Sequence, residues 1–292
     1  MASLKQQKME SQSQATWKRA LKCGISLAVF AASVLGRLLI RLFGKQPNGA
    51  CVVLYYHSVP PAQRRQFAKQ LDVLMRHAKI VDVNGTVTLA PGVQHVGVTF
   101  DDAFENFVQC ALPELEKRHI PATVFAISGE FGKNFGPSGR PEKIMSVEQM
   151  RKLPQSLVTI GSHTVSHPLL PSVSDQRAHE ELNQSRQQLE SILCRQIRLF
   201  SFPFGGFNSK LIDFCRDAGY ERVFTTLPTF AFVRPDEFVV GRIRVDPTDW
   251  PLEFRLKLAG AYRWLPWAFA IKRKLLARRH EESSRRDLAP SK

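Results

Sequence analysis

The sequence predicts an α/β fold, a single distorted (β/α) barrel of about seven parallel strands, with membrane-associating segments at both ends. Short apolar runs alternate with amphipathic helical patterns from Cys51 to Val245, and strands that alternate with helices form βα units with parallel strands. The length of 292 residues suits one such domain, because α/β barrels of this size are routinely single domains. The excess positive charge lies outside Cys51–Val245, which distinguishes both ends of the chain from the predicted barrel.

Seven apolar runs are the predicted strands. They span Cys51–Tyr56, Val96–Phe100, Thr123–Ile127, Leu157–Ile160, Arg198–Phe202, Arg222–Thr226 and Val239–Val245. Four stretches between them repeat apolar residues every three or four positions, as amphipathic helices do. These stretches are Phe67–Ala78, Phe104–Leu115, Leu182–Leu193 and Leu211–Ala218. We therefore expect one barrel domain over residues 47–250.

The net charge of +15 is concentrated at the two ends of the chain. Residues 1–46 contain eight Lys and Arg and one acidic residue, and residues 253–292 contain eleven and four. Residues 47–252 are nearly balanced, with 22 basic and 21 acidic residues. A nucleic-acid-binding domain carries its basic face on the fold, so we expect no nucleic-acid partner. Basic ends beside apolar stretches indicate contact with membrane lipid at both ends instead.

Residues 1–46 form a basic segment around one apolar run, residues 23–36. The run is shorter than the roughly 20 residues of a membrane span. It crosses the bilayer only if Arg37 and Arg41 snorkel, and otherwise lies in the interface as a basic amphipathic helix. A cleaved signal peptide is a third possibility, although no clear small-x-small site precedes Pro47. We interpret the segment as a retained membrane anchor.

Residues 251–292 form a basic, aromatic, amphipathic tail, and the end from Arg278 is predicted to be disordered. Aromatic side chains beside arginines are typical of the membrane interface, although a last helix packed on the barrel would show the same pattern. The five cysteines are odd in number and include no CxxC pair, which argues against a disulfide framework. We expect a protein of the inner or plasma membrane, with the barrel on the cytoplasmic side.

Two polar clusters follow predicted strands, where reactive groups of a parallel barrel collect. Asp101 and Asp102 close one strand. Such a pair is often only a helix N-cap, but adjacent carboxylates need a cation or a shared proton. His163 and His167 follow another strand, and their spacing would place both imidazoles on one side of a helical turn. One carboxylate and two imidazoles supply three metal ligands and leave positions open for water and substrate.

A third cluster, Pro203, Phe204 and Gly205, reads as a turn that presents Phe204 outward after the strand Arg198–Phe202. An exposed aromatic ring offers an apolar wall to the face of a sugar ring.

In this order, the segments Thr99–Asp102, Ser162–His167 and Phe200–Gly205 resemble the motifs of the NodB-homology polysaccharide deacetylases, carbohydrate esterase family four. The resemblance runs from about Cys51 to Asp249. It implies a hydrolase of linear amides that removes acetyl groups from an N-acetylated glycan. It further implies that Asp101 is the general base, that Asp102, His163 and His167 hold a divalent metal, usually zinc, and that Thr164 and Ser166 support the loop.

The chain departs from the family pattern in three places. Ala103 stands where the first motif usually has Gly, and Ser201 stands where an Arg pairs with the base. We expect Arg242, from the last strand, to replace that Arg. The late Leu-His motif, which carries the general acid, is missing. We consider His57, at the end of the first strand, as the substitute, or else as a residue that only orients Asp101. Two rival interpretations are an inactive glycan-binding barrel and a non-haem iron oxygenase, which uses the same three ligand types.

Overall fold

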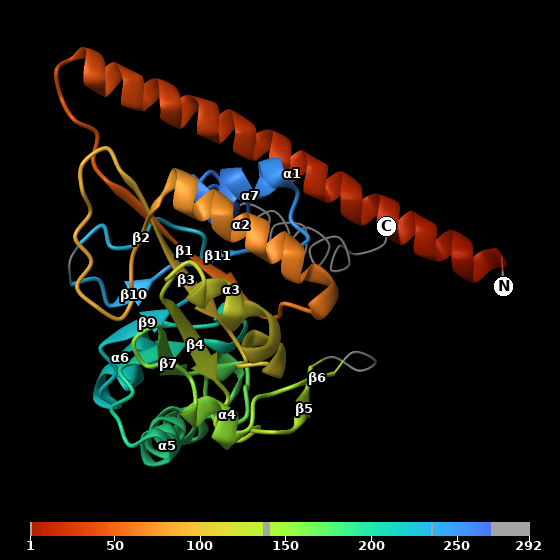
Figure 1. Ribbon diagram of the computed structural model, residues 1–292, viewed down its shortest axis with the longest axis vertical. Coiled ribbons are helices and arrows are strands. Elements are labelled where there is room, and N and C mark those ends of the chain that lie inside the picture. Colours follow the sequence, from red (N-terminus) through yellow and green to blue (C-terminus); the bar gives the residue numbers. More distant parts are fainter. Residues whose placement is uncertain (1, 137–140, 235, 270–292) are drawn as a thin grey trace, which may run out of the picture.

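A parallel sheet lies at the centre of the molecule (Figure 1). The computed structural model describes residues 2–136, 141–234 and 236–269. The strands follow the order β10-β9-β8-β7-β4-β3-β1-β11, with β2 beside β3, and every pairing is parallel. They span Ala50–Tyr56 (β1), Lys79–Ile80 (β2), Gln94–Phe100 (β3), Ala122–Ala126 (β4), Val158–Ser162 (β7), Leu199–Ser201 (β8), Arg222–Phe224 (β9), Val239–Val240 (β10) and Ile243–Arg244 (β11). The predicted parallel α/β barrel is confirmed.

The two edge strands of this curled sheet are neighbours in the sequence, since only Gly241 and Arg242 separate β10 from β11. The prediction of one continuous strand over Val239–Val245 is therefore wrong. A side chain at Gly241 would meet the carbonyl oxygen of Leu227 at 2.4 Å, so only glycine allows this close approach. Here the chain leaves one edge of the sheet and joins the other, and the side chain of Arg242 is buried between them.

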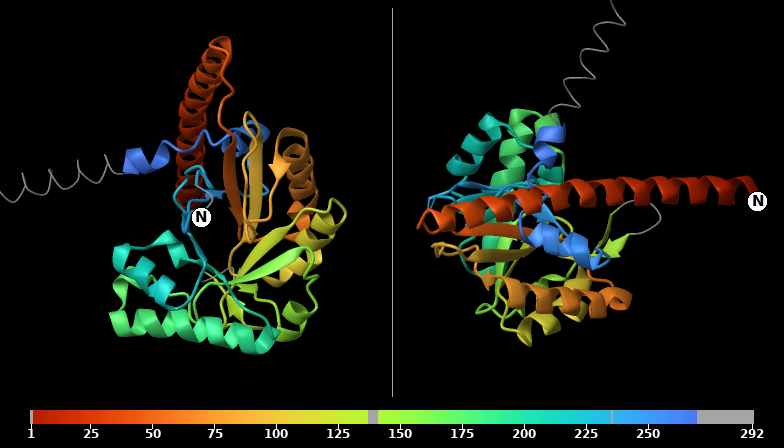
Figure 2. Two further views of the ribbon diagram at one scale, coloured as in Figure 1. Left: turned by 90° about the vertical axis from the view of Figure 1, so that its left-hand side faces the viewer. Right: turned by 90° about the horizontal axis from the view of Figure 1, so that it is seen from above.

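Helices cover the outer face of the sheet (Figures 1 and 2). They span Arg64–His77 (α2), Leu112–Glu116 (α3), Val147–Arg151 (α4), Asp175–Leu193 (α5) and Ser209–Asp217 (α6). A π-helical turn, Phe107–Ala111, leads into α3, and 3₁₀ turns lie at Pro61–Gln63, Leu170–Ser172 and Pro203–Gly205. The four stretches predicted to be helical lie in these elements except at their ends. Phe104 forms a β-bridge with Ile144, and Ala78 and Ala218 are the C-caps of α2 and α6. A separate hairpin, Asn134–Phe135 (β5) with Glu142–Lys143 (β6), stands beside the barrel.

Both faces of the central strands are buried, as a helix-covered parallel sheet requires. Val52 and Leu54 pack into the larger core, with residues of the covering helices. Cys51 and Val53 point the other way, into a second core with Phe125 and Phe224. Because successive strand residues point to opposite faces, the near-continuous apolar run of β1 fills both cores at once.

A long helix, α1 (Ala2–Leu42), crosses one end of the barrel and packs beside α7 (Pro251–Leu258) (Figures 1 and 2). The indole nitrogen of Trp264 donates to Ser26 Oγ at 2.9 Å, and Arg263 donates to Ser33 Oγ at 2.7 Å. Arg19 pairs with Glu253 at 2.5 Å. Polar contacts of single side chains thus join α1 to the segment of residues 253–264.

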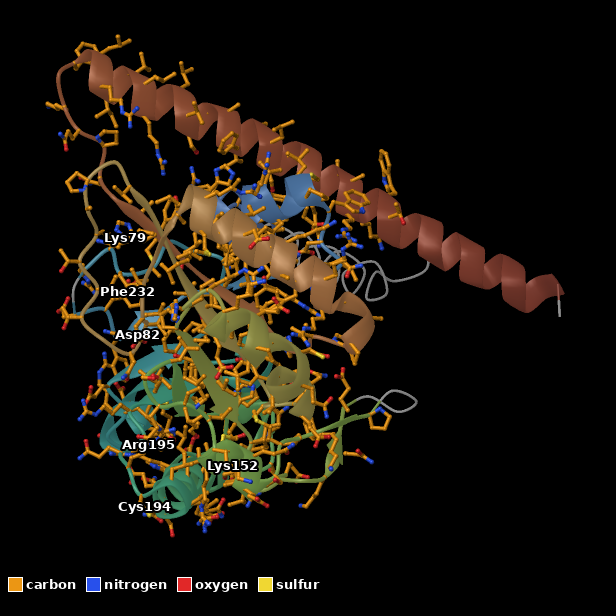
Figure 3. The ribbon with its side chains drawn as sticks, viewed as in Figure 1. Lys79, Asp82, Lys152, Cys194, Arg195 and Phe232 are labelled. Atoms are coloured by element: carbon orange, nitrogen blue, oxygen red, sulfur yellow. The ribbon has the colours of Figure 1, made fainter. Side chains whose placement is uncertain are left out.

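The outward side of α1 is apolar, which reverses the usual arrangement of a surface helix. Its inward side carries Arg19, Cys23, Ser26, Ser33 and Arg37, all buried or half-buried. Figure 3 shows side chains projecting from α1 away from the barrel. The large exposed apolar ones are Trp17, Leu21, Ile25, Leu27, Phe30, Val34, Leu35, Leu38, Leu39, Ile40 and Leu42. Among the described residues, Thr16–Leu42 is the one stretch long and apolar enough to cross a membrane.

The segment that follows Trp250 is part of the folded body rather than a free tail. Phe254 and Leu258 are buried in the larger core, and Leu256 and Tyr262 are buried against Cys23 of α1. Of the two interpretations of this segment, a last helix packed on the barrel is therefore the correct one for residues 251–262. Residues 270–292, which include the end predicted to be disordered, lie outside the described residues.

We predict that Phe254→Ala lowers the free energy of unfolding by about 3–5 kcal/mol, because the truncation leaves a cavity in the core. Urea unfolding of the full chain measures this loss. Trp267→Ala is the control, since the Trp267 side chain is 78% exposed, and it should leave the unfolding midpoint in place. Equal midpoints for the two variants would show that residues 251–262 do not contribute to the core.

Candidate active site

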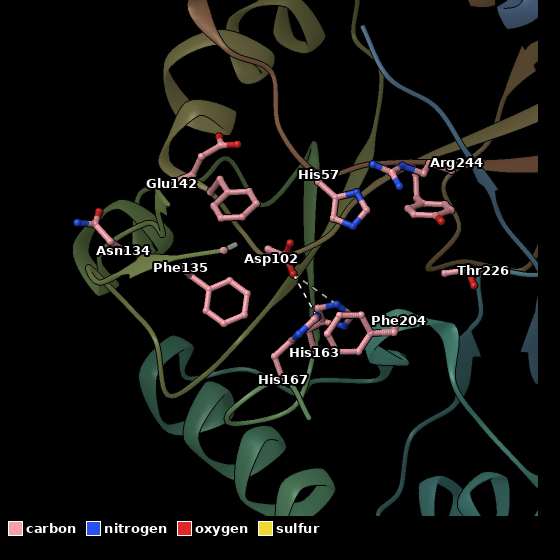
Figure 4. Close-up of a pocket in the computed structure, with 13 residues that line it drawn as sticks. His57, Asp102, Asn134, Phe135, Glu142, His163, His167, Phe204, Thr226 and Arg244 are labelled. Atoms are coloured by element: carbon pink, nitrogen blue, oxygen red, sulfur yellow. Dashed lines mark ion pairs between the residues drawn. The ribbon is translucent and has the colours of Figure 1, made fainter. Parts of the chain in front are cut away.

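A cavity of about 920 Å³ lies at the carboxyl ends of the strands (Figure 4). Barrel enzymes place their active sites at this end. Its walls are formed by Tyr55, His57, Asp102, Phe104, Asn134, Phe135, Gly136, Glu142, His163, His167, Phe204, Thr226 and Arg244. His57, Asp102 and the two other histidines come from the loops after β1, β3 and β7, so the sequence prediction that these loops meet at one barrel end agrees with the structure.

Asp102, His163 and His167 converge at the floor of this cavity (Figure 4). Their ligand atoms all lie within 4.8 Å of one another. The Nε2 atoms of His163 and His167 are 3.6 and 3.5 Å from Asp102 Oδ1, which is too long for hydrogen bonds. Asp102 Oδ1 is buried and has no hydrogen-bond partner among the described residues.

Without a metal ion, the three side chains of this group are mainly neutral at pH 7. Burial lowers the pKa of His163 to about 3 and that of His167 to about 4, so both imidazoles are neutral at pH 7 and form no ion pair with Asp102. His163 Nδ1 lies 2.7 Å from the carbonyl oxygen of Ser201. A neutral ring donates there and leaves its Nε2 lone pair facing Asp102. Burial, followed by the charge of Asp101, raises the pKa of Asp102 to about 8. Two imidazole lone pairs and the Asp102 carboxyl group, which would lose its proton on metal binding, fit a divalent metal.

The histidine pair lies on an irregular loop after β7, so the expectation of a helical turn is wrong. Thr164 and His167 have φ angles of 69° and 58°, a left-handed conformation that costs energy for residues with side chains. Glu181 of α5 stabilises the loop by accepting hydrogen bonds from the backbone of Val165 and Ser166 and from Ser166 Oγ. Thr164 Oγ1 accepts from the backbone N–H of His167 at 2.9 Å. Side chains, rather than helix geometry, thus hold the two imidazoles together.

The Asp pair is not a helix cap either, because Asp102 and Ala103 have consecutive left-handed φ angles of 67° and 57°. The turn after β3 directs Asp101 and Asp102 to different partners. The φ angle at Ala103 is one that glycine adopts without strain, which agrees with the Gly that the resemblance leads us to expect there.

Asp101 forms a buried bidentate ion pair with Arg242. The guanidinium donates to the two carboxylate oxygens at 2.7 and 2.8 Å. It also donates to Ser201 Oγ at 2.7 Å and Thr99 Oγ1 at 3.1 Å. Burial alone would raise the pKa of Asp101, but the charge of Arg242 holds this pKa at about 2. The guanidinium thus lies beside Ser201, the position at which the sequence resemblance leads us to expect an Arg.

Of the other predicted site residues, His57 and Phe204 line the cavity, whereas two residues of the turn around Phe204 do not. His57 is half-buried in its wall, where burial lowers its pKa and the charge of Asp101 only partly offsets this effect. Phe204 is 68% exposed, and its ring centroid lies 4.6 Å from that of His167. Pro203 and Gly205 do not line the cavity. They shape the turn instead: Gly205 has φ of 69°, and a side chain there would meet Thr226 Oγ1 at 1.9 Å.

Several lining residues have no counterpart among the predicted site residues. Glu142 comes from the hairpin strand β6, accepts from Ser58 Oγ at 2.6 Å and also accepts from Asn106. Glu142 carries no local signal in the sequence, because it lies in none of the predicted strands, helices or motifs. Arg244 lies beside Thr226 at the opposite end of the cavity (Figure 4). The sequence does contain a signal for Arg244, because Arg242 and Arg244 flank Ile243 in an otherwise apolar run.

Residues 89–223 match the protein-family model described as polysaccharide deacetylase. The domain belongs to this family. The matched region contains Asp101, Asp102 and both histidines of the metal-ligand group, and it ends before Arg242.

Individual relatives agree with this assignment. YxkH of Bacillus subtilis (strain 168), described as a candidate polysaccharide deacetylase, is 27% identical over 208 residues, 67% of this chain and 71% of YxkH. IcaB from Ammonifex degensii has a similar solved structure, with 28% identity and a TM-score of 0.62 over 73% of this chain and 98% of IcaB. The Streptococcus pyogenes deacetylase PplD, solved with acetate, shares the fold at 21% identity, with a TM-score of 0.61 over 72% of this chain and 99% of PplD.

We predict that Arg242→Met destabilises the deacetylase domain by about 3–5 kcal/mol, because it leaves Asp101 buried without a partner charge. The double variant Arg242→Met/Asp101→Asn should recover much of this loss. Guanidinium unfolding compares the two, with Arg198→Met, an exposed arginine, as the control. If the single variant is as stable as the control, the ion pair has no structural role.

Proposed function

We propose that the protein is a metal-dependent polysaccharide deacetylase that hydrolyses the acetamide of N-acetylated sugar residues, in surface or exopolysaccharide metabolism. The observation that carries this proposal is the unpartnered, buried oxygen of Asp102 between two neutral imidazoles. Asp102, His163 and His167 would hold the ion, for which zinc suits the one-carboxylate, two-histidine donor set. When bound, a divalent ion supplies Lewis-acid polarisation of the acetyl carbonyl and lowers the pKa of a bound water.

Asp101 is suited to accept the proton of the attacking water. Its pKa of about 2 keeps it ionised over the physiological range, so an acceptor is always present. Arg242 fixes both carboxylate oxygens and therefore the direction from which a water can approach. A carboxylate with so low a pKa holds a proton only briefly, so the proton must pass to another group.

His57 is the proposed source of the proton that the departing amine needs. It lines the same cavity as Asp102. Burial lowers its pKa, and the nearby charge of Asp101 partly offsets this effect. A neutral imidazole can receive a proton and then donate it to the nitrogen of the collapsing intermediate. The competing role is to orient Asp101 without exchanging a proton.

The cavity walls support a sugar as the substrate. Tyr55, Phe104, Phe135 and Phe204 offer aromatic faces, while Asn134 and Glu142 offer polar groups. Sugars combine apolar ring faces with equatorial hydroxyl groups, and binding sites with a few convergent polar groups fix their orientation.

Two other functions would use the same scaffold. A glycan-binding barrel without activity needs neither an incomplete cation site nor a buried Asp101–Arg242 pair next to it. A non-haem iron oxygenase needs the three ligands but gives no role to Asp101, and its chemistry is foreign to the deacetylase family.

We further propose that α1 is a retained anchor whose apolar outer side lies in the membrane. The contacts of Arg19, Ser26 and Ser33 with the body support retention, because a cleaved signal peptide would leave Glu253 and Trp264 without these partners. The five cysteines are free, which favours the cytoplasmic side. Lipid contact at the other end is not part of this proposal, since residues 251–262 are packed on the body.

We expect acetate release from a panel of N-acetylated oligosaccharides, loss of this activity with a chelator, and recovery on adding zinc. His167→Ala should lose bound metal and turnover together, because one of three protein ligands is removed. Metal content measured on the same samples tests the site. Full turnover in chelator would refute metal dependence, and bound metal without acetate release from any glycan would favour a rival function.

The same assay separates the base from the ligands. Asp101→Asn should keep the metal but reduce turnover by roughly 10²–10⁴-fold, as expected for a lost general base. His57→Gln should also keep the metal and reduce turnover if His57 delivers the proton. Loss of metal in Asp101→Asn would show that Asp101 is a ligand instead.

Membrane association should depend on the outer side of α1. Leu35→Glu/Leu42→Glu places two charges on this side and should shift the full-length protein toward the soluble fraction, because apolar burial in lipid is lost. Gln66→Glu/Met75→Glu is the charge-matched control on the exposed side of α2 and should leave the distribution unchanged. Equal distributions for both double variants would contradict the anchor.

A further inference from the structure

A second cavity, of about 560 Å³, lies next to the active site between α1, α7 and the end of β11. Arg244 and Thr226 line both cavities, so a ligand in one reaches the other past these two side chains. Nothing in the deacetylase mechanism above uses this second cavity.

The second cavity has an excess of positive charge. Five cationic side chains line it, Lys18, Arg19, Lys22, Arg244 and Lys257, against three carboxylates, Asp246, Asp249 and Glu253. Two of the carboxylates are already neutralised within the body.

Arg19 and Lys257 hold these two carboxylates. Arg19 lies 2.5 Å from Glu253, and Lys257 lies 2.7 Å from Asp249 and 3.1 Å from Glu253. Asp246 accepts hydrogen bonds from the backbone and hydroxyl of Thr248.

Lys18, Lys22 and Arg244 form no ion pair or side-chain hydrogen bond within the described part of the chain. All three are exposed. They can therefore bind an anion that comes from outside the protein, and a phosphate group is the anion that several Lys and Arg side chains bind best.

The position of these cations points to an anion at a membrane surface. Lys18 and Lys22 lie on the helix whose outer side carries Leu21 and Ile25, both exposed. Tyr262, Leu265 and Phe269 form an apolar part of the cavity wall. A ligand here therefore meets cationic groups and apolar side chains within one cavity.

We propose that the second cavity binds the phosphate of a lipid-linked saccharide, and that the deacetylase acts on an N-acetylated sugar attached through phosphate to a lipid. This inference rests on the proposed function. In a 2-acetamido sugar phosphorylated at C1, neighbouring ring carbons carry the two groups, which suits adjoining cavities. Water adds to the acetyl carbonyl carbon and the amide C–N bond breaks. Acetate leaves, the nitrogen gains a proton and stays on the sugar as the amine, and the phosphate is unchanged.

Four probes test the proposal on the full-length enzyme with metal bound, in detergent micelles. They are decyl N-acetylglucosaminide, decyl N-acetylglucosaminyl phosphate, methyl N-acetylglucosaminyl phosphate and uridine diphosphate N-acetylglucosamine. The decyl phosphate should exceed the neutral decyl glycoside in kcat/KM by roughly tenfold or more, the factor that corresponds to about one charge-assisted contact. Added salt should reduce this ratio, because partly exposed charges are screened.

Variants that remove positive charge test whether the second cavity causes the preference for the decyl phosphate. Lys18→Gln/Lys22→Gln should lower the ratio of kcat/KM for the decyl phosphate to that for the neutral glycoside. Lys69→Gln/Lys117→Gln removes the same charge from exposed positions away from both cavities and should leave the ratio unchanged.

The other possible results of these assays each refute one part of the proposal. Equal kcat/KM for the two decyl probes refutes phosphate binding, while their acetate release upholds the deacetylase function. A preference for the methyl phosphate or the nucleotide over the decyl phosphate refutes the lipid-linked substrate and leaves a soluble phosphosugar. If the enzyme releases acetate neither from these probes nor from the oligosaccharide panel, the proposed function is refuted, and this inference with it.

Discussion

Arg242 is fully buried and donates to both oxygens of Asp101, so the two ends of the curled sheet meet around one ion pair. The guanidinium lies 4.6 and 5.2 Å from the ring centroids of Tyr55 and Phe125, which enclose it. Removing either charge would leave the other buried and unpaired, at a cost of several kcal/mol. The pair therefore fixes the crossover from β10 to β11 and the ionised state of Asp101 together. The architecture of the barrel and the chemistry of its cavity depend on the same contact.

The metal-ligand group depends on a different constraint, the strained loops that follow β3 and β7. Asp102, Thr164 and His167 are all left-handed, and such conformations persist only where surrounding contacts determine them. For the second loop those contacts come from Glu181, which lies 16 residues after Val165 and 15 after Ser166. The parallel strands thus provide the position of the site, while Glu181 of α5 stabilises the geometry of the histidine loop.

The membrane proposal and the lipid-linked substrate follow from one arrangement, the packing of α1 on α7. The polar inward side of α1 pairs with the body, and its apolar outward side is exposed. The same packing brings Lys18 and Lys22 to a cavity that adjoins the catalytic one. An anchor that also lines a substrate cavity would present the active site to molecules held at the membrane surface.

The sequence alone determined the parallel α/β class, the four main helices and the family, because apolar periodicity and three short motifs are local signals. The tertiary structure decided what depends on distant residues. It split the last predicted strand at Gly241, since two sheet edges meet there. It packed residues 251–262 on the body, where composition matched both a membrane tail and a core helix. It added Glu142 and Arg244 to the cavity, because only folding brings a hairpin and an edge strand to the carboxyl ends of β3 and β7.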